Sequence, residues 1–170
     1  MWTVVLGLLP AVLVWLAFSG FNAFRILIIS TGSALLSEMG IQKILGRKIR
    51  IYDGSAVITA FLLTLFLPPA LPSWLVALTA FFSVVMGKEI FGGLGQNLFN
   101  PALLGLAFLF ASFPAFRNIS PLNGWALQAY LVSILLGGVL LWAKRIIQWE
   151  LPILFLTGFF AFSPLGGKGA

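Results

Sequence analysis

The residues most able to support chemistry lie in one glycine- and asparagine-rich run, Gly87-Lys-Glu-Ile-Phe-Gly-Gly-Leu-Gly-Gln-Asn-Leu-Phe-Asn-Pro-Ala102. Glycines allow positive φ angles and let a backbone approach a ligand closely. Irregular backbone at membrane depth is tolerated only where it lines a cavity or is buried in protein. Free amides at the start of the following helix favour an anion such as a phosphate. We therefore predict a binding site here, with an ordinary cytoplasmic loop as the alternative.

Two acidic residues accompany this run. Glu89 follows a predicted span, where a carboxylate within a membrane indicates a functional site. With its neighbour Lys88 it also fits a surface ion pair of little energetic value. Asp53 precedes Ser55 at the start of another predicted span, where its carboxylate accepts free helix amides. Either this cap is the whole role of Asp53, or the helix start faces the glycine-rich run and supports its pocket.

The composition shows what kind of elements must position these residues. Of 170 residues, 61% are hydrophobic and 8% are charged, and the mean hydropathy is +1.09. Soluble domains carry about 25% charged residues, so we expect a membrane protein. The absence of cysteine and histidine excludes disulfides and thiolate or imidazole ligation of zinc or haem. Glu38 and Glu150 lie near predicted cytoplasmic helix ends among basic residues, and we expect them at the membrane interface.

Hydropathy predicts an all-α integral membrane protein with six to seven transmembrane helices. A helix needs about 20 residues to cross a bilayer. The predicted helices are Trp2–Ser19, Phe21–Met39, Gly54–Leu67, Ser73–Gly87, Leu98–Phe113, Gly124–Ala143 and Leu151–Ser163. The first is expected to be a retained span rather than a signal peptide.

The basic residues predict the orientation of these spans. With a cytoplasmic N-terminus, seven of the ten basic residues lie inside and only Arg25, Arg117 and Lys168 lie outside. This distribution follows the positive-inside rule and indicates a topology rather than nucleic-acid binding. We expect a multi-pass protein of the cell's inner (plasma) membrane. The turn Leu67-Pro-Pro-Ala-Leu-Pro72 then faces outward.

A weak internal repeat suggests the domain organisation. The pattern Leu8-Leu9-x-x-Val12-Leu13-x-Trp15 recurs as Leu135-Leu136-x-x-Val139-Leu140-x-Trp142. The copies lie in the first and sixth predicted helices, an offset of five, so the second copy is inverted, as in many transporters. The predicted organisation is a five-helix membrane repeat over 1–113 with its glycine-rich loop at 87–102, an external linker over 114–123, and a partial second repeat of two helices over 124–170.

Three stretches together resemble the NqrB/RnfD family: Asp53-Gly-Ser-Ala-x-Ile-Thr, Leu67-Pro-Pro, and the glycine-rich run. The resemblance is strong from Asp53 to Pro114 and looser elsewhere. These proteins are membrane subunits of the sodium-pumping NADH:quinone oxidoreductase and of the ferredoxin:NAD⁺ oxidoreductase complex. The resemblance implies a flavin-carrying subunit with two inverted five-helix repeats and a urea-transporter-like fold. Electrons pass through its flavins while the complex moves Na⁺ or H⁺.

The resemblance also implies roles for individual residues. Glu89 matches an acid linked to cation uptake, so we place it on the ion pathway, with Asp53 and Ser55 supporting the pocket. By position, the residues expected to shape the flavin region are Gly92, Gly93, Gly95, Asn97, Asn100 and Pro101.

The sequence departs from the family at the site of covalent flavin attachment. The family bonds FMN to a threonine in a Ser-Gly-Ala-Thr motif after the fifth helix. Here the corresponding segment, 114–123, contains Ser120 but no threonine. We therefore expect FMN or riboflavin to bind without a covalent bond. The family's Gly-Arg-Ala-Phe is Gly105-Leu-Ala-Phe108 here, and we expect only two of the five helices of the second repeat in this sequence.

Three functions fit these observations. The first is a redox subunit of an ion-translocating electron transport complex, a translocase with no independent activity. The second is a channel or transporter of the same fold without a redox role. The third is an assembly subunit whose flavin site has decayed, against which the intact glycine-rich run and Glu89 argue. We expect the chain to lie in the lipid bilayer. We also expect neighbouring membrane subunits of the complex or a second copy of the chain to supply the wall that a partial second repeat leaves missing around the backbone of residues 92–97, because lipid offers no hydrogen bonds to exposed backbone.

Overall fold

The computed structural model describes residues 1–93 and 99–116, and all regular elements in these ranges are helical. The second predicted repeat, 124–170, and most of the linker lie outside them. In chain order the helices are α1 (Trp2–Ile44), α2 (Ser55–Phe66), α3 (Ser73–Val84) and α4 (Pro101–Ser112). This agrees with the all-α expectation, while the internal repeat and the number of spans stay predictions.

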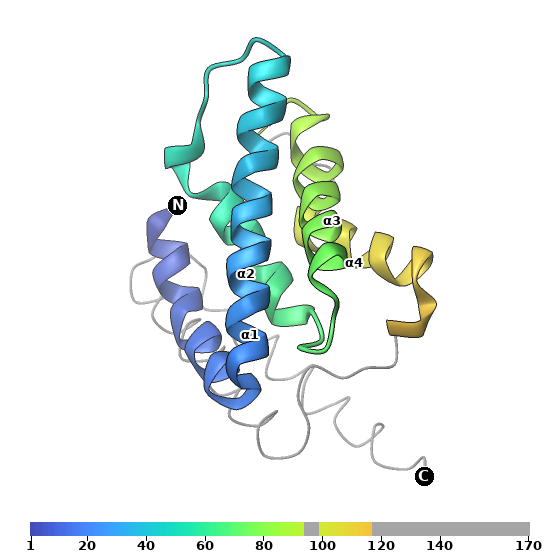
Figure 1. Cartoon of the computed structure of the whole chain (residues 1–170). Coiled ribbons are helices and arrows are strands. Elements are labelled where there is room, and N and C mark those ends of the chain that lie inside the picture. The colour runs from blue at the N-terminus through green and yellow to red at the C-terminus, as the bar shows by residue number, and fades with distance from the viewer. Residues whose placement is uncertain (94–98, 117–170) are drawn as a thin grey trace, which may run out of the picture.

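Helix α1 is two helices joined at a sharp bend. Gly20 has φ 63° and ψ −146°, a conformation that glycine adopts without the steric cost of a side chain. The predicted break between Ser19 and Phe21 is therefore confirmed. Figure 1 shows the chain reversing at this point, so that the two arms form a hairpin. By length and composition, α1 is apolar enough to cross a membrane.

The other helices are shorter than a bilayer. Each of α2, α3 and α4 has 12 residues, which rise about 18 Å against a hydrocarbon core of about 30 Å. Helix α3 continues into a π-helical turn, Val85–Glu89, which extends it toward the glycine-rich run. Residues 67–72 form the predicted turn between α2 and α3.

Small side chains allow the helices to pack closely. Ala23, Ala34, Ala56, Ala60 and Ala80 are almost completely buried. Hydroxyl groups then reach across to neighbouring backbone: Ser33 Oγ donates to Ala77 O at 2.7 Å. In lipid, where apolar contact between helices gains little from excluding water, such close packing and polar contacts stabilise the bundle. Large apolar side chains such as Phe21, which is 81% exposed, fit a lipid-facing surface.

The two ends of the bundle differ in charge. Arg25 lies at the end that carries the 67–72 turn, where it donates to two carbonyl oxygens of that turn. The opposite end, at the top of Figure 1, carries the C-terminal end of α1 and the connection to α2. The described basic residues of that end are Lys43, Arg47, Lys48, Arg50 and Lys88. This segregation is the one used to predict the orientation, and which end faces the cytoplasm stays a prediction.

Candidate functional site

The π-helical turn after α3 brings two charged side chains into the protein. Lys88 is 2% exposed and Glu89 is 1% exposed. π-Helical turns are rare and are often found at functional sites. Gly87 fixes this turn against the start of α4, because a Cβ atom at Gly87 would lie 2.7 Å from the Cα of Pro101. Two ends of the glycine-rich run, distant in sequence, therefore pack directly on each other.

Lys88 is held by groups from two other helices. Its ammonium forms an ion pair with Glu38, on α1, and donates a hydrogen bond to the Ser55 hydroxyl at the start of α2. That hydroxyl in turn donates to Asp53 Oδ1 at 2.6 Å. The Ser55 amide donates to the same oxygen at 2.8 Å, so the predicted cap by Asp53 is present. The start of α2 thus contacts Lys88 as well as being capped.

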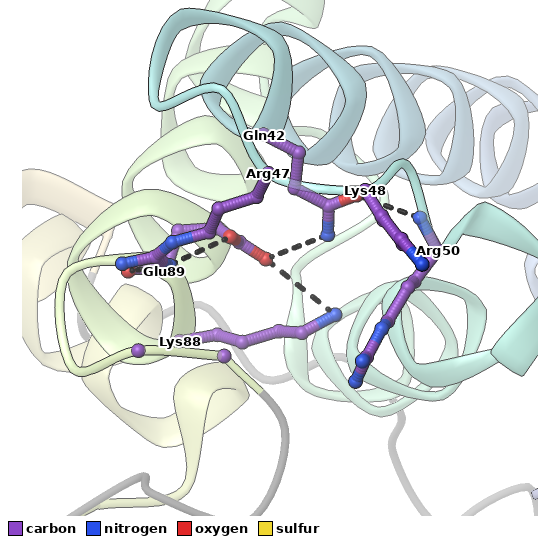
Figure 2. Close-up of a pocket in the computed structure, with 8 residues that line it drawn as sticks. Gln42, Arg47, Lys48, Arg50, Lys88 and Glu89 are labelled. Atoms are coloured by element: carbon purple, nitrogen blue, oxygen red, sulfur yellow. Dashed lines mark hydrogen bonds and ion pairs between the residues drawn. The ribbon is translucent and has the colours of Figure 1, made fainter.

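Gln42 connects the two buried carboxylates to the loop beyond α1. Its Nε2 donates to Glu38 Oε1 at 3.0 Å and to Glu89 Oε1 at 3.2 Å. Its own oxygen accepts from the backbone amide of Arg50 at 2.8 Å. Arg47 closes the other side of Glu89, donating to its carbonyl oxygen at 3.1 Å, with its guanidinium 3.8 Å from the carboxylate. Figure 2 shows these side chains converging on Glu89.

The buried carboxylates are incompletely satisfied. Within the described residues, Glu38 Oε2 has no hydrogen-bond partner although the side chain is fully buried. A buried carboxylate oxygen without a partner is costly, because hydration is lost without replacement. Lys88 Nζ is also 3.8 Å from Glu89 Oε1, so one ammonium serves two carboxylates. One carboxylate oxygen of the cluster, Glu38 Oε2, is therefore left without a donor among the described residues.

A cavity of about 380 Å³ opens beside this cluster. Glu89 supplies the carboxylate in its wall, and the glycines before residue 94 form a wall without side chains. Its lining residues are Gln42, Arg47, Lys48, Arg50, Lys88, Glu89, Gly92 and Gly93. Figure 2 shows Arg47 and Glu89 on one side of this cavity and Lys48 and Arg50 on the other.

The predicted flavin-region residues are placed only in part. Gly92 and Gly93 have φ angles of 110° and 102°, which side-chain-bearing residues rarely adopt, and both line the cavity. Asn100 accepts the Ala102 amide at 3.0 Å as the N-cap of α4, and Pro101 occupies the first turn as expected. Gly95 and Asn97 lie outside the described residues. The roles of these residues toward a flavin stay predictions.

The structure narrows the sequence-based interpretation of two charged residues, Glu38 and Lys88. Glu38 is fully buried and paired with Lys88, so it is not an exposed acid at the end of its helix, and its depth in the membrane stays a prediction. Lys88 is likewise buried, so its ion pairs are not on the surface. The sequence feature that indicates a polar contact of Glu38 is its spacing from Gln42, because residues four apart lie on one face of a helix. Its partner Lys88 is 50 residues away, which local pattern does not reveal.

The chain is similar to one protein family and to several named proteins. The model of the NQR2, RnfD, RnfE family matches residues 1–129. A subunit of the proton-translocating ferredoxin:NAD(+) oxidoreductase complex of Clostridium ljungdahlii is 29% identical, over 92% of this chain and 61% of the relative. A subunit of the Na(+)-translocating ferredoxin:NAD(+) oxidoreductase complex of Acetobacterium woodii is 30% identical, over 99% and 64%. A subunit of the ion-translocating oxidoreductase complex of Shewanella denitrificans is 43% identical over 113 residues, 65% of this chain and 32% of the relative.

The chain spans less than two thirds of the length of these relatives. The match with the Clostridium protein runs over 201 residues although this chain has 170, so the relative contains positions in the matched region that have no counterpart here.

Proposed function

Because the chain belongs to the NQR2, RnfD, RnfE family, we propose that it is a membrane subunit of a redox-driven complex that translocates Na⁺ or H⁺. The observation that carries the proposal is the pair of buried carboxylates, Glu38 and Glu89, bridged by Gln42 and Lys88. Ionisable groups placed inside a membrane bundle are costly and are found mainly on ion or proton pathways. The names of the relatives, which are subunits of ion-translocating complexes, support the same role.

Glu89 is the proposed entry point of the cation. Its side chain lines the cavity, which opens to the outside of the bundle, whereas Glu38 is not among the lining residues. Carboxylate and backbone carbonyl oxygens are suitable ligands for Na⁺, and a carboxylate also carries a proton. Gln42 donates to both carboxylates, so a cation bound at Glu89 is linked through one side chain to Glu38.

We further propose that electrons reach the complex through a flavin, FMN or riboflavin, bound without a covalent bond near the glycine-rich run. The support is the position of Gly92 and Gly93 in the cavity wall and the start of α4 at Pro101, together with the lack of the Ser-Gly-Ala-Thr threonine. When bound, the flavin would supply one- and two-electron transfer. Other membrane subunits of the complex would cover the described helices, and a second copy of the chain is the alternative. Sizing in mild detergent that found a lone, stable monomer with bound flavin would contradict this.

The experiment is Glu89→Gln in the assembled complex. Glutamine keeps the size and the hydrogen-bonding capacity but removes the charge, so the fold is retained. We expect the Na⁺ concentration for half-maximal turnover to rise about tenfold, as the loss of one charged ligand predicts, while flavin content is unchanged. Flavin is measured from the visible spectrum before and after acid precipitation, which also tests for covalent attachment.

The matched control is Lys43→Gln, on the exposed face of the same end of the bundle and outside the cavity lining. If Glu89→Gln loses flavin at an unchanged ion dependence, the acid belongs to the cofactor pocket instead. Unchanged ion dependence together with the absence of any flavin spectrum in the unsubstituted protein favours the channel or the assembly subunit.

A further inference from the structure

The cavity beside Glu89 carries positive charge that its own residues do not neutralise. Four of its lining side chains are cationic and one, Glu89, is a carboxylate. Lys88 is paired with Glu38, and Arg47 faces Glu89. Among residues 1–93 and 99–116, neither the Lys48 ammonium nor the Arg50 guanidinium has a hydrogen-bond or ion-pair partner. Two positive charges therefore remain on the cavity wall without a counter-charge.

The shape of the cavity leaves these charges available to a ligand. Gly92 and Gly93 leave one wall without side chains, and a Cβ atom at Gly93 would meet nothing within 4 Å. The volume of about 380 Å³ lies in the range of sites for small organic ligands, about 300–1,000 Å³. The cavity is thus larger than an inorganic ion needs and has room for a charged group together with the molecule that carries it.

We propose that this cavity binds a phosphate group, held by Lys48 and Arg50. A phosphate monoester carries about −1.5 to −2 charges at neutral pH, which matches the two uncompensated cations. Arginine presents a planar fork of donors that fits phosphate oxygens, and lysine adds a compact positive charge. The proposal deepens the proposed function, because Glu89 and two glycines of the proposed flavin region line the same cavity.

Two carriers of a phosphate have access to this position. One is a soluble cofactor such as FMN. The other is an anionic lipid headgroup, since exposed apolar side chains flank Lys48 and Arg50: Ile44, at the end of α1, is 79% exposed, and Tyr52 is 88% exposed. Basic pockets at membrane interfaces commonly bind such headgroups. Both carriers present an anionic phosphate, a monoester in FMN and a diester in a phospholipid, and separate arms of one experiment distinguish them.

The first arm compares FMN with riboflavin, which differ only in the phosphate. The full chain is purified in dodecyl maltoside without phosphate buffer, and binding is followed by flavin fluorescence. We expect FMN to bind at least about tenfold more tightly than riboflavin, and Lys48→Gln or Arg50→Gln to remove that difference. Lys43→Gln makes the same chemical change five residues earlier, on a side chain that does not line the cavity, and is expected to leave the difference intact.

The second arm uses native mass spectrometry of the same proteins with phosphatidylglycerol or phosphatidylcholine. If the phosphate comes from lipid, the unsubstituted chain and Lys43→Gln retain phosphatidylglycerol preferentially, and Lys48→Gln and Arg50→Gln lose the preference. A positive result in either arm supports the phosphate site and identifies the carrier. The proposal is overturned if neither anionic probe is preferred, or if Lys43→Gln weakens binding as much as Lys48→Gln. Equal binding of FMN and riboflavin by all variants, together with no preference for phosphatidylglycerol, would overturn the phosphate site while leaving the proposed flavin function standing.

Discussion

The two ends of the bundle each hold a cationic side chain inside the protein, but in opposite ways. At the proline-rich end, Arg25 donates to Pro69 O at 3.3 Å and to Leu71 O at 2.9 Å. Its acceptors are neutral carbonyls of a fixed turn. At the other end, Lys88 is held by the carboxylate of Glu38 and lies near that of Glu89. Its acceptors are charged and can bind a proton or another cation instead.

This contrast separates a structural cation from one that takes part in an exchangeable network. The carbonyl oxygens around Arg25 stay neutral whatever ions are present. The hydrogen bonds of Arg25 therefore hold α1 against the turn before α3 without depending on ions. The carboxylates around Lys88 change charge when they bind a proton or exchange a cation. The desolvation cost of burying the Lys88 ammonium is therefore offset only as long as Glu38 and Glu89 stay ionised.

The largest expected effect comes from Lys88→Met. This change leaves Glu38 and Glu89 buried without their shared ammonium, and breaking a buried ion pair costs about 3–5 kcal/mol. We expect a large fall in the thermal unfolding temperature of the purified full chain in detergent. Adding Glu38→Gln to Lys88→Met should recover part of the loss, because one stranded charge is then removed. If the double variant is no more stable than Lys88→Met, the carboxylate is not the source of the cost.

A smaller effect is expected at the opposite end from Arg25→Met. Two hydrogen bonds to carbonyl oxygens are lost, at about 1–3 kcal/mol, but no buried opposite charge is left behind. The unfolding temperature should fall less than for Lys88→Met, and the ion dependence of the assembled complex should not change. A shift in ion dependence equal to that of a Glu89 variant would show that the two ends are not separate in function.

An effect in the same range as that of Arg25→Met is expected from Gly87→Ala, which changes the position of Lys88 and Glu89 rather than their charges. The new Cβ would lie 2.7 Å from Pro101 Cα, so the π-helical turn or the start of α4 must shift, at about 1–3 kcal/mol. Gly40→Ala is the matched control, because a Cβ there meets nothing within 4 Å and the helix gains propensity. The comparison is made on unfolding temperature. Equal behaviour of the two alanine variants would mean that the contact with Pro101 does not hold the turn.

The sequence was most informative where structure depends on neighbouring residues. The bend at Gly20, the turn at 67–72, the cap by Asp53 and the start of α4 at Pro101 all follow from local stereochemistry. Glu89 stood out because a carboxylate beside a glycine-rich break is unusual in a membrane protein.

The ion pair between Lys88 and Glu38 could not be predicted in the same way. Glu38 and Lys88 are 50 residues apart, and only the packing of α1 against the π-helical turn brings them together. The same holds for Gly87, whose importance arises from contact with Pro101 rather than from its own φ angle. Hydropathy places a residue along the membrane normal but gives no information about which side chain faces it from a neighbouring helix.

At the end of the bundle that carries Lys88 and Glu89, the hydrogen-bond partners of Gln42 allow only one orientation of its side-chain amide. Its amide has a donor face turned to two carboxylates and an acceptor face turned to the Arg50 backbone amide. A half-turn of the terminal amide would set oxygen against oxygen on one side and hydrogen against hydrogen on the other. Glutamate in this place would lack the donors, and lysine would lack the acceptor. The planar Gln42 amide therefore fixes the position of the loop that carries Lys48 and Arg50 relative to the two carboxylates. Only one orientation of this amide satisfies all three hydrogen bonds.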